Sequence, residues 1–373
     1  MPRLEHCSAT TAVDPRHGRC VDLWRMSMIF ICLRRGRHAV FVLALAGVAL
    51  AVSPLYAQDR AATLPELKLS TTQSPAFPLG RAGERWAQLV NEAKGAAFEV
   101  RQYPGATLSL RDPGREFGAL KDGPADLAVG SALAWSGQFP PLGAYVLPWL
   151  ASDAREQAAL ATDALLRDAV FARMEASGVV GLAIAPLGEH VLATAKAPVA
   201  TTLACSGLRI RVMPLHHVIA FYIALGALPQ AMGYAQAQAA LAEGSLDGQD
   251  ATPTTLVATR AYASGQKFVT RWGAFADVMV FAVRKGAWDS WTDVQRALVR
   301  SAAERAAREA AAPAQEDAAL AQLTKDGVTI VRLSPSQRAA FLDAAQPAIA
   351  AWTSWVGADL VDAARAAVAA AGN

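Results

Sequence analysis

Short apolar runs alternate with longer alanine-rich stretches from residue 66 to the end of the chain. ELKLSTT (66–72), FEVRQYPG (98–105) and ADLAVGS (125–131) have the composition and bounding turns of strands. GRAGERWAQLVNEAKG (80–95) and REFGALKDG (115–123) lie between them and have the apolar spacing of helices. This strand–helix order predicts an α/β layer built on a largely parallel sheet.

The same alternation continues through the rest of the chain. We expect further strands at 179–188, 208–213, 277–284 and 328–334. We expect one or two helices at 154–178 and further helices at 216–228, 235–244, 292–327, 336–357 and 358–371. The strand that starts at Asp277 is expected to enter a loop at KGAWDSW, and Pro313 is expected to kink or break the long helical region.

The strongest apolar run lies near the N-terminus. Ala39–Ala51 carries no charge, Arg34, Arg35 and Arg37 precede it, and SPLYAQ follows it with a small residue at Ala57. This is the order of a secretory signal peptide, and the run is shorter than the ~20 residues that span a bilayer. We therefore expect export to the periplasm and cleavage after Ala57. An uncleaved N-terminal anchor is the alternative.

Residues 1–57 are therefore treated as a leader. Residues 1–25 lack signal-peptide character, and Met26 or Met28 could be the true start. The leader holds seven of the 35 Lys and Arg residues and three of the 32 Asp and Glu residues, so the remainder has a net charge of −1. A chain with this balance carries no basic footprint for nucleic acid, and we expect no nucleic-acid partner.

Signatures of covalent chemistry are missing from the sequence. It contains no G-x-S-x-G, G-x-G-x-x-G, Walker A, H-E-x-x-H or C-x-x-C motif, so the sequence favours neither an enzyme nor a cofactor. His216 and His217 are adjacent at a helix start, and we interpret both as surface or capping residues rather than zinc ligands. Asp247 and Asp250 could act as an acid/base pair, but SLDGQD has the composition of a turn.

The one cysteine beyond the leader is Cys205. The exported chain therefore has no intramolecular disulfide. We interpret Cys205 as a buried thiol rather than a nucleophile, because no activating partner stands near it in the sequence.

Four stretches in order along the chain carry a family resemblance. They are YPGATLS with GALKDGPADLAVG, then YVLPWL, then SGLRIRVMP with ALGALPQAM and AQAALAEGSLDGQDATP, and last WDSWTDVQRALVRSAAERAA. Together they resemble the substrate-binding proteins of tripartite ATP-independent periplasmic (TRAP) transporters, the DctP-like family. The resemblance covers roughly residues 67–357.

The resemblance implies a two-lobed α/β periplasmic-binding-protein fold. The chain would cross between the lobes more than once, and the ligand would lie in the cleft between them. We expect lobe 1 to comprise residues 58–187 plus 276–315 and lobe 2 to comprise residues 188–275 plus 316–373.

The strand LRIRVMP (208–214) holds two arginines among apolar residues, which suggests that at least one of them meets an anion. The resemblance makes Arg211 the residue that pairs with a ligand carboxylate. A guanidinium presents a planar pair of donors that matches a carboxylate, and a closed cleft strengthens the pair. We expect Arg209 to be solvated. A structural salt bridge is the alternative role for Arg211.

Two departures from the family concern polar contacts. His190, in GEHVLAT, stands where many members have a further arginine, and a neutral or partly protonated imidazole there would bind more weakly and with pH sensitivity. Ala251 stands where many members have an asparagine. Gln249 and Asp250, just before it, are also expected to bind ligand.

Aromatic residues stand in or near segments that would line the cleft, and they could accept an acid with an apolar body or could be core packing. Trp135 and Trp272 are the preferred candidates, ahead of Phe139 and Trp149.

These inferences lead to one expected function. The chain would capture a small organic acid, a monocarboxylate with some apolar body, and deliver it as a monomer to the membrane subunits of a TRAP permease. The alternatives are presentation of the ligand to a membrane sensor and a periplasmic enzyme on the same scaffold.

Overall fold

The computed structural model describes residues 11–13, 20–22, 64–151, 153–310 and 314–372. In the unit formed by residues 1–63, strands β1 (Thr11–Val13) and β2 (Cys20–Asp22) pair in antiparallel fashion. The rest of the predicted leader, including Ala57, lies outside the described residues, as does Pro313. None of the helices within the described ranges has the length and apolar character that a membrane span needs.

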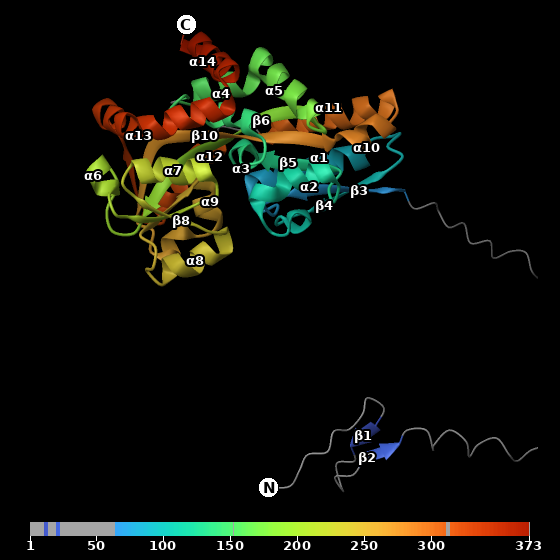
Figure 1. The fold of residues 1–373 in the computed structure, drawn as a ribbon, viewed down its shortest axis with the longest axis horizontal. Helices are drawn as coiled ribbons and strands as arrows, with labels where there is room; N and C mark the ends of the chain where they lie inside the picture. The colour runs from blue at the N-terminus through green and yellow to red at the C-terminus, as the bar shows by residue number, and fades with distance from the viewer. Residues whose placement is uncertain (1–10, 14–19, 23–63, 152, 311–313, 373) are drawn as a thin grey trace, which may run out of the picture. The chain divides into compact units, whose positions relative to one another are not determined.

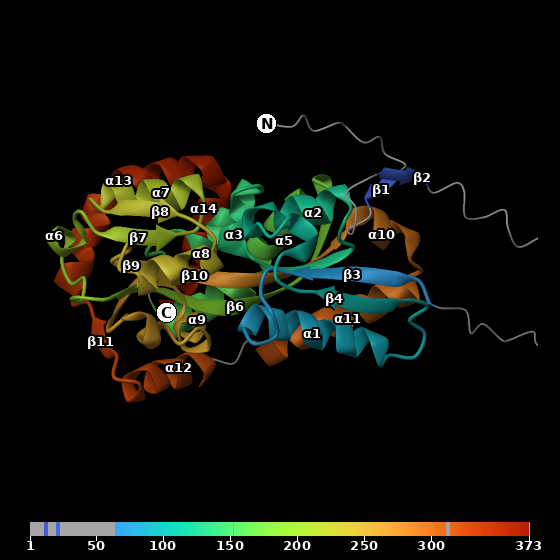
Figure 2. The same cartoon turned by 90° about the horizontal axis from the view of Figure 1, so that it is seen from below.

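The second unit, residues 64–373, is built on a nine-stranded sheet (Figures 1 and 2). Its strand order is β4-β3-β5-β10-β6-β9-β7-β8, and β11 pairs with β10. The strands are β3 (Glu66–Thr71), β4 (Glu99–Tyr103), β5 (Leu127–Ser131), β6 (Val179–Thr194), β7 (Arg209–Val212), β8 (Leu228–Ala231), β9 (Gly248–Ala251), β10 (Phe268–Arg284) and β11 (Thr329–Arg332).

Helices cover both faces of this sheet. The α-helices are α1 (Pro78–Asn91), α2 (Glu116–Asp122), α3 (Ala132–Ser136), α4 (Ala154–Thr162), α5 (Ala164–Ala176), α6 (Thr202–Cys205), α7 (His216–Ala224), α8 (Tyr234–Ala242), α9 (Pro253–Ala258), α10 (Lys285–Ser290), α11 (Asp293–Ala310), α12 (Ala314–Lys325), α13 (Pro335–Val356) and α14 (Ala358–Gly372). Figure 2 shows α1, α9, α11 and α12 on one side of the sheet and α2, α3, α7 and α13 on the other.

The two long strands, β6 and β10, hold the unit together. They pair in antiparallel fashion from Phe268↔Thr194 to Arg284↔Val179. One half of β10 pairs with β5 and the other half with β11, whereas β6 pairs with β9 only near its C-terminal end. The β6–β10 ladder shifts register around its middle, near Gly188, which has φ of +122°. The two lobes of the α/β fold therefore share these strands.

The lobe boundaries remain a prediction. We propose that residues 58–187 plus 276–315 form lobe 1 and residues 188–275 plus 316–373 form lobe 2. The change of partner strands along β10 supports a division near its middle.

Local sequence explains why several elements begin and end where they do. Gly123 follows α2 with φ of +116°, a conformation that a side chain would strain, and so it ends the helix. Ser334 and Gln337 form a reciprocal capping box at the start of α13. Predicted strands and helices up to residue 178 correspond to β3 through α5 within a few residues.

Three expectations were wrong. The sheet is mixed rather than largely parallel, because β10 runs antiparallel to β5 and β6, and β6 antiparallel to β9. Strand β10 begins at Phe268, well before Asp277, and the expected loop after it is helix α10. SLDGQD is not simply a turn, because its last three residues open the buried strand β9.

Candidate functional site

Arg211 lies on β7 between the buried residues Ile210 and Val212, and only 8% of it is exposed. Its Nε donates to the carbonyl of Met232 (3.1 Å), and its Nη1 reaches the carbonyl of Asp250 (3.5 Å). The guanidinium carbon lies 5.5 Å from the centroid of the Tyr234 ring. No ion pair within the described ranges includes Arg211, so its structural salt-bridge alternative finds no carboxylate there.

Burial lowers the pKa of Arg211 and outweighs the opposing attraction of Asp250. A guanidinium nevertheless stays charged in proteins. A buried cation of this kind is costly until an anion compensates it. The site therefore favours an anionic partner.

Gln249 is fully buried on β9, where it is the register partner of Arg211. Its Oε1 has a long contact with Gln238 Nε2 (3.5 Å), and its Nε2 has no hydrogen-bond partner in the described part of the chain.

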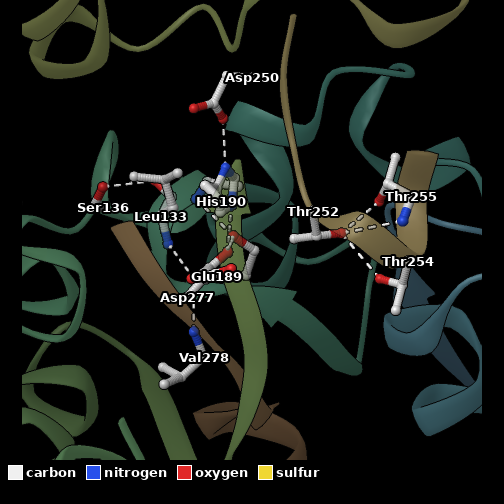
Figure 3. A network of polar contacts seen from close by, with 12 residues as sticks. Leu133, Ser136, Glu189, His190, Asp250, Thr252, Thr254, Thr255, Asp277 and Val278 are labelled. Atoms are coloured by element: carbon white, nitrogen blue, oxygen red, sulfur yellow. Dashed lines mark hydrogen bonds and ion pairs between the residues drawn. The ribbon is translucent and has the colours of Figure 1, made fainter. Parts of the chain in front are cut away.

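His190 lies between two carboxylates (Figure 3). Its Nδ1 is 2.5 Å from Asp250 Oδ1, and its Nε2 is 3.9 Å from Asp277 Oδ2. Asp250 also accepts a hydrogen bond from the hydroxyl of Tyr222 (2.7 Å). Strands β6, β9 and β10 and helix α7 thus meet in one buried polar network.

Burial by itself lowers the pKa of His190, but the carboxylates of Asp250 and Asp277 outweigh burial and raise the pKa to about 10. His190 is therefore an imidazolium at neutral pH. The expectation of a neutral or partly protonated ring was wrong, because two acids flank this position, Asp250 from β9 and Asp277 from β10. Both are distant from His190 in the chain, so no local pattern indicates them.

Asp277 connects the network to the start of α3. Its carboxylate accepts hydrogen bonds from Ser131 Oγ (2.5 Å) and from the backbone N–H groups of Leu133 (3.1 Å) and Val278 (2.8 Å). A chain of hydrogen bonds and charges therefore runs from the end of β5 through Asp277 and His190 to Asp250.

Trp135, a residue of α3, lies apart from this network; it is fully buried, and its ring centroid is 5.6 Å from that of Phe117 on α2. Its indole N–H donates to Glu116 Oε2 (3.0 Å), and Ser70 Oγ donates to Glu116 Oε1 (2.7 Å). Glu116 is fully buried, and burial raises its pKa to about 7 despite these two hydrogen bonds. Contact between Trp135 and a ligand stays a prediction.

Trp272 lies in an aromatic cluster next to the network. Its ring is 5.7 Å from that of Tyr222 and 5.8 Å from that of Phe221, and Trp149 packs against it at 6.1 Å. Trp149 and Phe139 are buried as well. These positions favour core packing for the aromatic candidates, and a ligand contact by Trp272 stays a prediction.

A cavity of about 430 Å³ lies on the other side of β6. Glu189, which borders it, is adjacent to His190 and so points to the opposite face of the strand. Arg271, which also borders the cavity, pairs with Glu189 and with Glu316 (3.1 Å). None of the six residues predicted to bind ligand lines this cavity.

Three residues flagged in the sequence have structural roles. His217 is buried, contrary to expectation: its ring packs on Trp352 at 4.3 Å, and burial lowers its pKa to about 3. Arg209 is not simply solvated, because it forms a two-bond ion pair with Asp247 (2.9 and 3.0 Å). Cys205 is buried, as expected, and burial raises its pKa to about 12.

The sequence interpretation missed Tyr222, Tyr234 and Asp277. Tyr222 occupies a helix that reads as uniformly apolar, and Asp277 opens what looked like an ordinary buried strand. Only the tertiary fold brings them to His190 and Arg211.

The mixed two-lobed α/β fold is that of the periplasmic binding proteins of TRAP transporters. Residues 69–354 match the sequence model of the DctP family, described as bacterial extracellular solute-binding protein, family 7. The chain therefore belongs to this family, whose members are solute-binding proteins.

Named relatives agree with this assignment. The C4-dicarboxylate-binding periplasmic protein DctP of Rhodobacter capsulatus is 26% identical over 81% of this chain and 91% of its own length. A TRAP periplasmic solute-binding protein from Ralstonia eutropha, solved with bound (S)-2-acetolactate, is 35% identical with a TM-score of 0.77, covering 82% of this chain and 99% of that chain. The sugar acid binding protein DctPAm from Advenella mimigardefordensis, solved with galactonate, shares the fold at 18% identity, with a TM-score of 0.74 and coverage of 83% and 99%.

Proposed function

We propose that this protein captures a small monocarboxylate with an apolar body in the periplasm and delivers it to the membrane subunits of a TRAP permease. Arg211 would anchor the ligand carboxylate. The observation that carries the proposal is a buried guanidinium without a carboxylate partner in the described residues.

The other buried cations argue for this choice of anchor. Arg271, which borders the cavity of about 430 Å³, already pairs with Glu189 and Glu316. The His190 imidazolium is compensated by Asp250 and Asp277. Only Arg211 among these three retains a charge that an incoming anion would neutralise.

The same charge balance supports a monocarboxylate over a dicarboxylate. A second ligand carboxylate would need a second uncompensated cation, and His190 does not supply one. The relative from Ralstonia eutropha was solved with acetolactate, which also has a single carboxylate and a short carbon chain. Membership in a family of TRAP solute-binding proteins supports delivery to a permease.

A thermal-shift screen of small carboxylates on the purified protein tests the proposal. A ligand that binds the native state raises the melting temperature by mass action. We expect a hit among monocarboxylates whose shift disappears in Arg211→Ala. Arg209→Ala is the matched control, because Arg209 lies on the same strand but is partly exposed and paired with Asp247. A neutral sugar that stabilises wild type and Arg211→Ala equally would contradict the proposal.

A further inference from the structure

The side-chain amide of Gln249 is a buried donor without an acceptor. Gln249 has no exposed surface, and within the described ranges nothing accepts a hydrogen bond from its Nε2. Buried polar groups are normally satisfied, since an unpaired donor costs free energy. An acceptor that is supplied from outside the chain would remove this cost.

The position of Gln249 relative to Arg211 indicates where this acceptor would lie. The two residues are register partners on the parallel strands β9 and β7, whose backbones run about 4.8 Å apart. Helix α8 covers both, with Gln238 contacting Gln249 and Tyr234 stacking on Arg211. The two side chains therefore share one face of the sheet.

Arg211 itself retains donor capacity on this face. Its Nε and Nη1 are directed at the carbonyls of Met232 and Asp250, whereas Nη2 donates to no atom of the described chain. A carboxylate bound by Nη2 would bring its neighbouring carbon close to the Gln249 amide. An oxygen on that carbon would accept the hydrogen bond that Nε2 lacks.

We propose that Gln249 is a specificity-determining residue that donates to a carbonyl or hydroxyl oxygen on the carbon next to the ligand carboxylate. The ligand class is then the 2-oxo or 2-hydroxy monocarboxylates, and simple monocarboxylates without that oxygen bind more weakly. This inference rests on the proposed function, because it takes Arg211 as the anchor of the carboxylate.

Calorimetric titration with matched acids tests the inference. The probes are 2-oxobutyrate, 2-hydroxybutyrate and butyrate, measured on wild type and on Gln249→Met, which replaces the amide by an unbranched apolar chain of similar length. We expect wild type to bind at least one oxygenated acid about tenfold or more tightly than butyrate, since an unpaired buried donor is penalised. In Gln249→Met this ratio should fall close to one, with butyrate affinity kept.

Gln230→Met is the matched control. Gln230 is the register partner of Arg211 on the other flanking strand, β8, but it is exposed. The control variant should keep the wild-type ratio. If Gln249→Met fails to fold, the wild-type ratio by itself still decides the substrate class.

Three results would overturn the inference, and they differ in what else they overturn. Equal wild-type affinity for butyrate and its oxygenated analogues, with binding of both lost in Arg211→Ala, removes the role of Gln249 but leaves the anchor. Failure of all three acids to bind wild type overturns both this inference and the proposed monocarboxylate function. A parallel loss of all affinities in Gln249→Met assigns Gln249 a structural role only and also refutes the inference.

Discussion

Replacing Asp250 by Asn should destabilise the protein strongly, because it removes the nearer of the two acids that keep His190 charged. The pKa of His190 is raised from 6.5 to about 10. A pKa shift of this size corresponds to roughly 5 kcal/mol of stabilisation of the folded state. Removing one partner of a buried ion pair typically costs about 3–5 kcal/mol, which agrees in scale.

The sign of the pH dependence follows from the direction of this shift. Because the folded pKa lies above the unfolded one, the contribution is fully present below about pH 6.5 and is lost as the pH rises through 10. In Asp250→Asn the remaining acid, Asp277, is 3.9 Å from the ring, and the pKa should fall toward its ordinary value. As the pKa of His190 falls, Asp250→Asn should lose less stability than wild type when the pH is raised to 10.

Urea unfolding at pH 6, 8 and 10 measures the free energy of unfolding, and an NMR titration of the His190 ring measures its pKa. Tyr222→Phe is the control, because it removes one hydrogen bond to Asp250 and should cost only about 1 kcal/mol. A wild-type His190 that titrates near pH 6.5, or an Asp250→Asn variant that loses less than about 1 kcal/mol, would refute this account of the network.

Three further changes have clear expected outcomes. Gly130→Ala would place a Cβ 2.0 Å from the Trp135 ring, so we expect a loss of several kcal/mol in urea unfolding, and a wild-type stability would contradict the packing. Arg209→Ala should cost no more than about 1 kcal/mol, because its pair with Asp247 is partly exposed and screened by salt; a larger, salt-insensitive loss would contradict this. Glu116 has its pKa raised to about 7, so wild type should lose up to about 3 kcal/mol of stability as the pH rises from 5 to 8, whereas Glu116→Gln should show a flatter profile; an unchanged profile would mean that Glu116 does not titrate in this range.

The sequence predicted the fold class and most elements, because the apolar periodicity of segments such as 66–91 and 154–178 is local. It failed at SLDGQD, where the burial of strand β9 depends on partners distant in the chain. Asp250 is tolerated in the core only because His190 and Tyr222 approach it from β6 and α7. No local pattern encodes that arrangement.

In the candidate site, too, local sequence indicated some features, whereas others depend on the tertiary fold. Arg211 could be chosen from its strand and the family resemblance, but its freedom from a protein carboxylate is a property of the fold. His190 could be located from GEHVLAT, whereas its charge depends on Asp250 and Asp277. His216 and His217 are adjacent in the sequence, and no local pattern distinguishes them. In the structure His216 is exposed, whereas His217 is buried and packs on Trp352.

The role of Arg211 is tested most directly by a cycle that varies the protein and the ligand together. The monocarboxylate with the largest thermal shift and its primary amide would each be titrated calorimetrically into wild type and Arg211→Met. The amide lacks the negative charge that would pair with the buried Arg211, and losing one partner of a buried ion pair costs about 3–5 kcal/mol. Wild type should therefore bind the acid more than about 100-fold more tightly than the amide. In Arg211→Met this preference should vanish; an acid preference that survives the substitution unchanged would show that the carboxylate is recognised elsewhere.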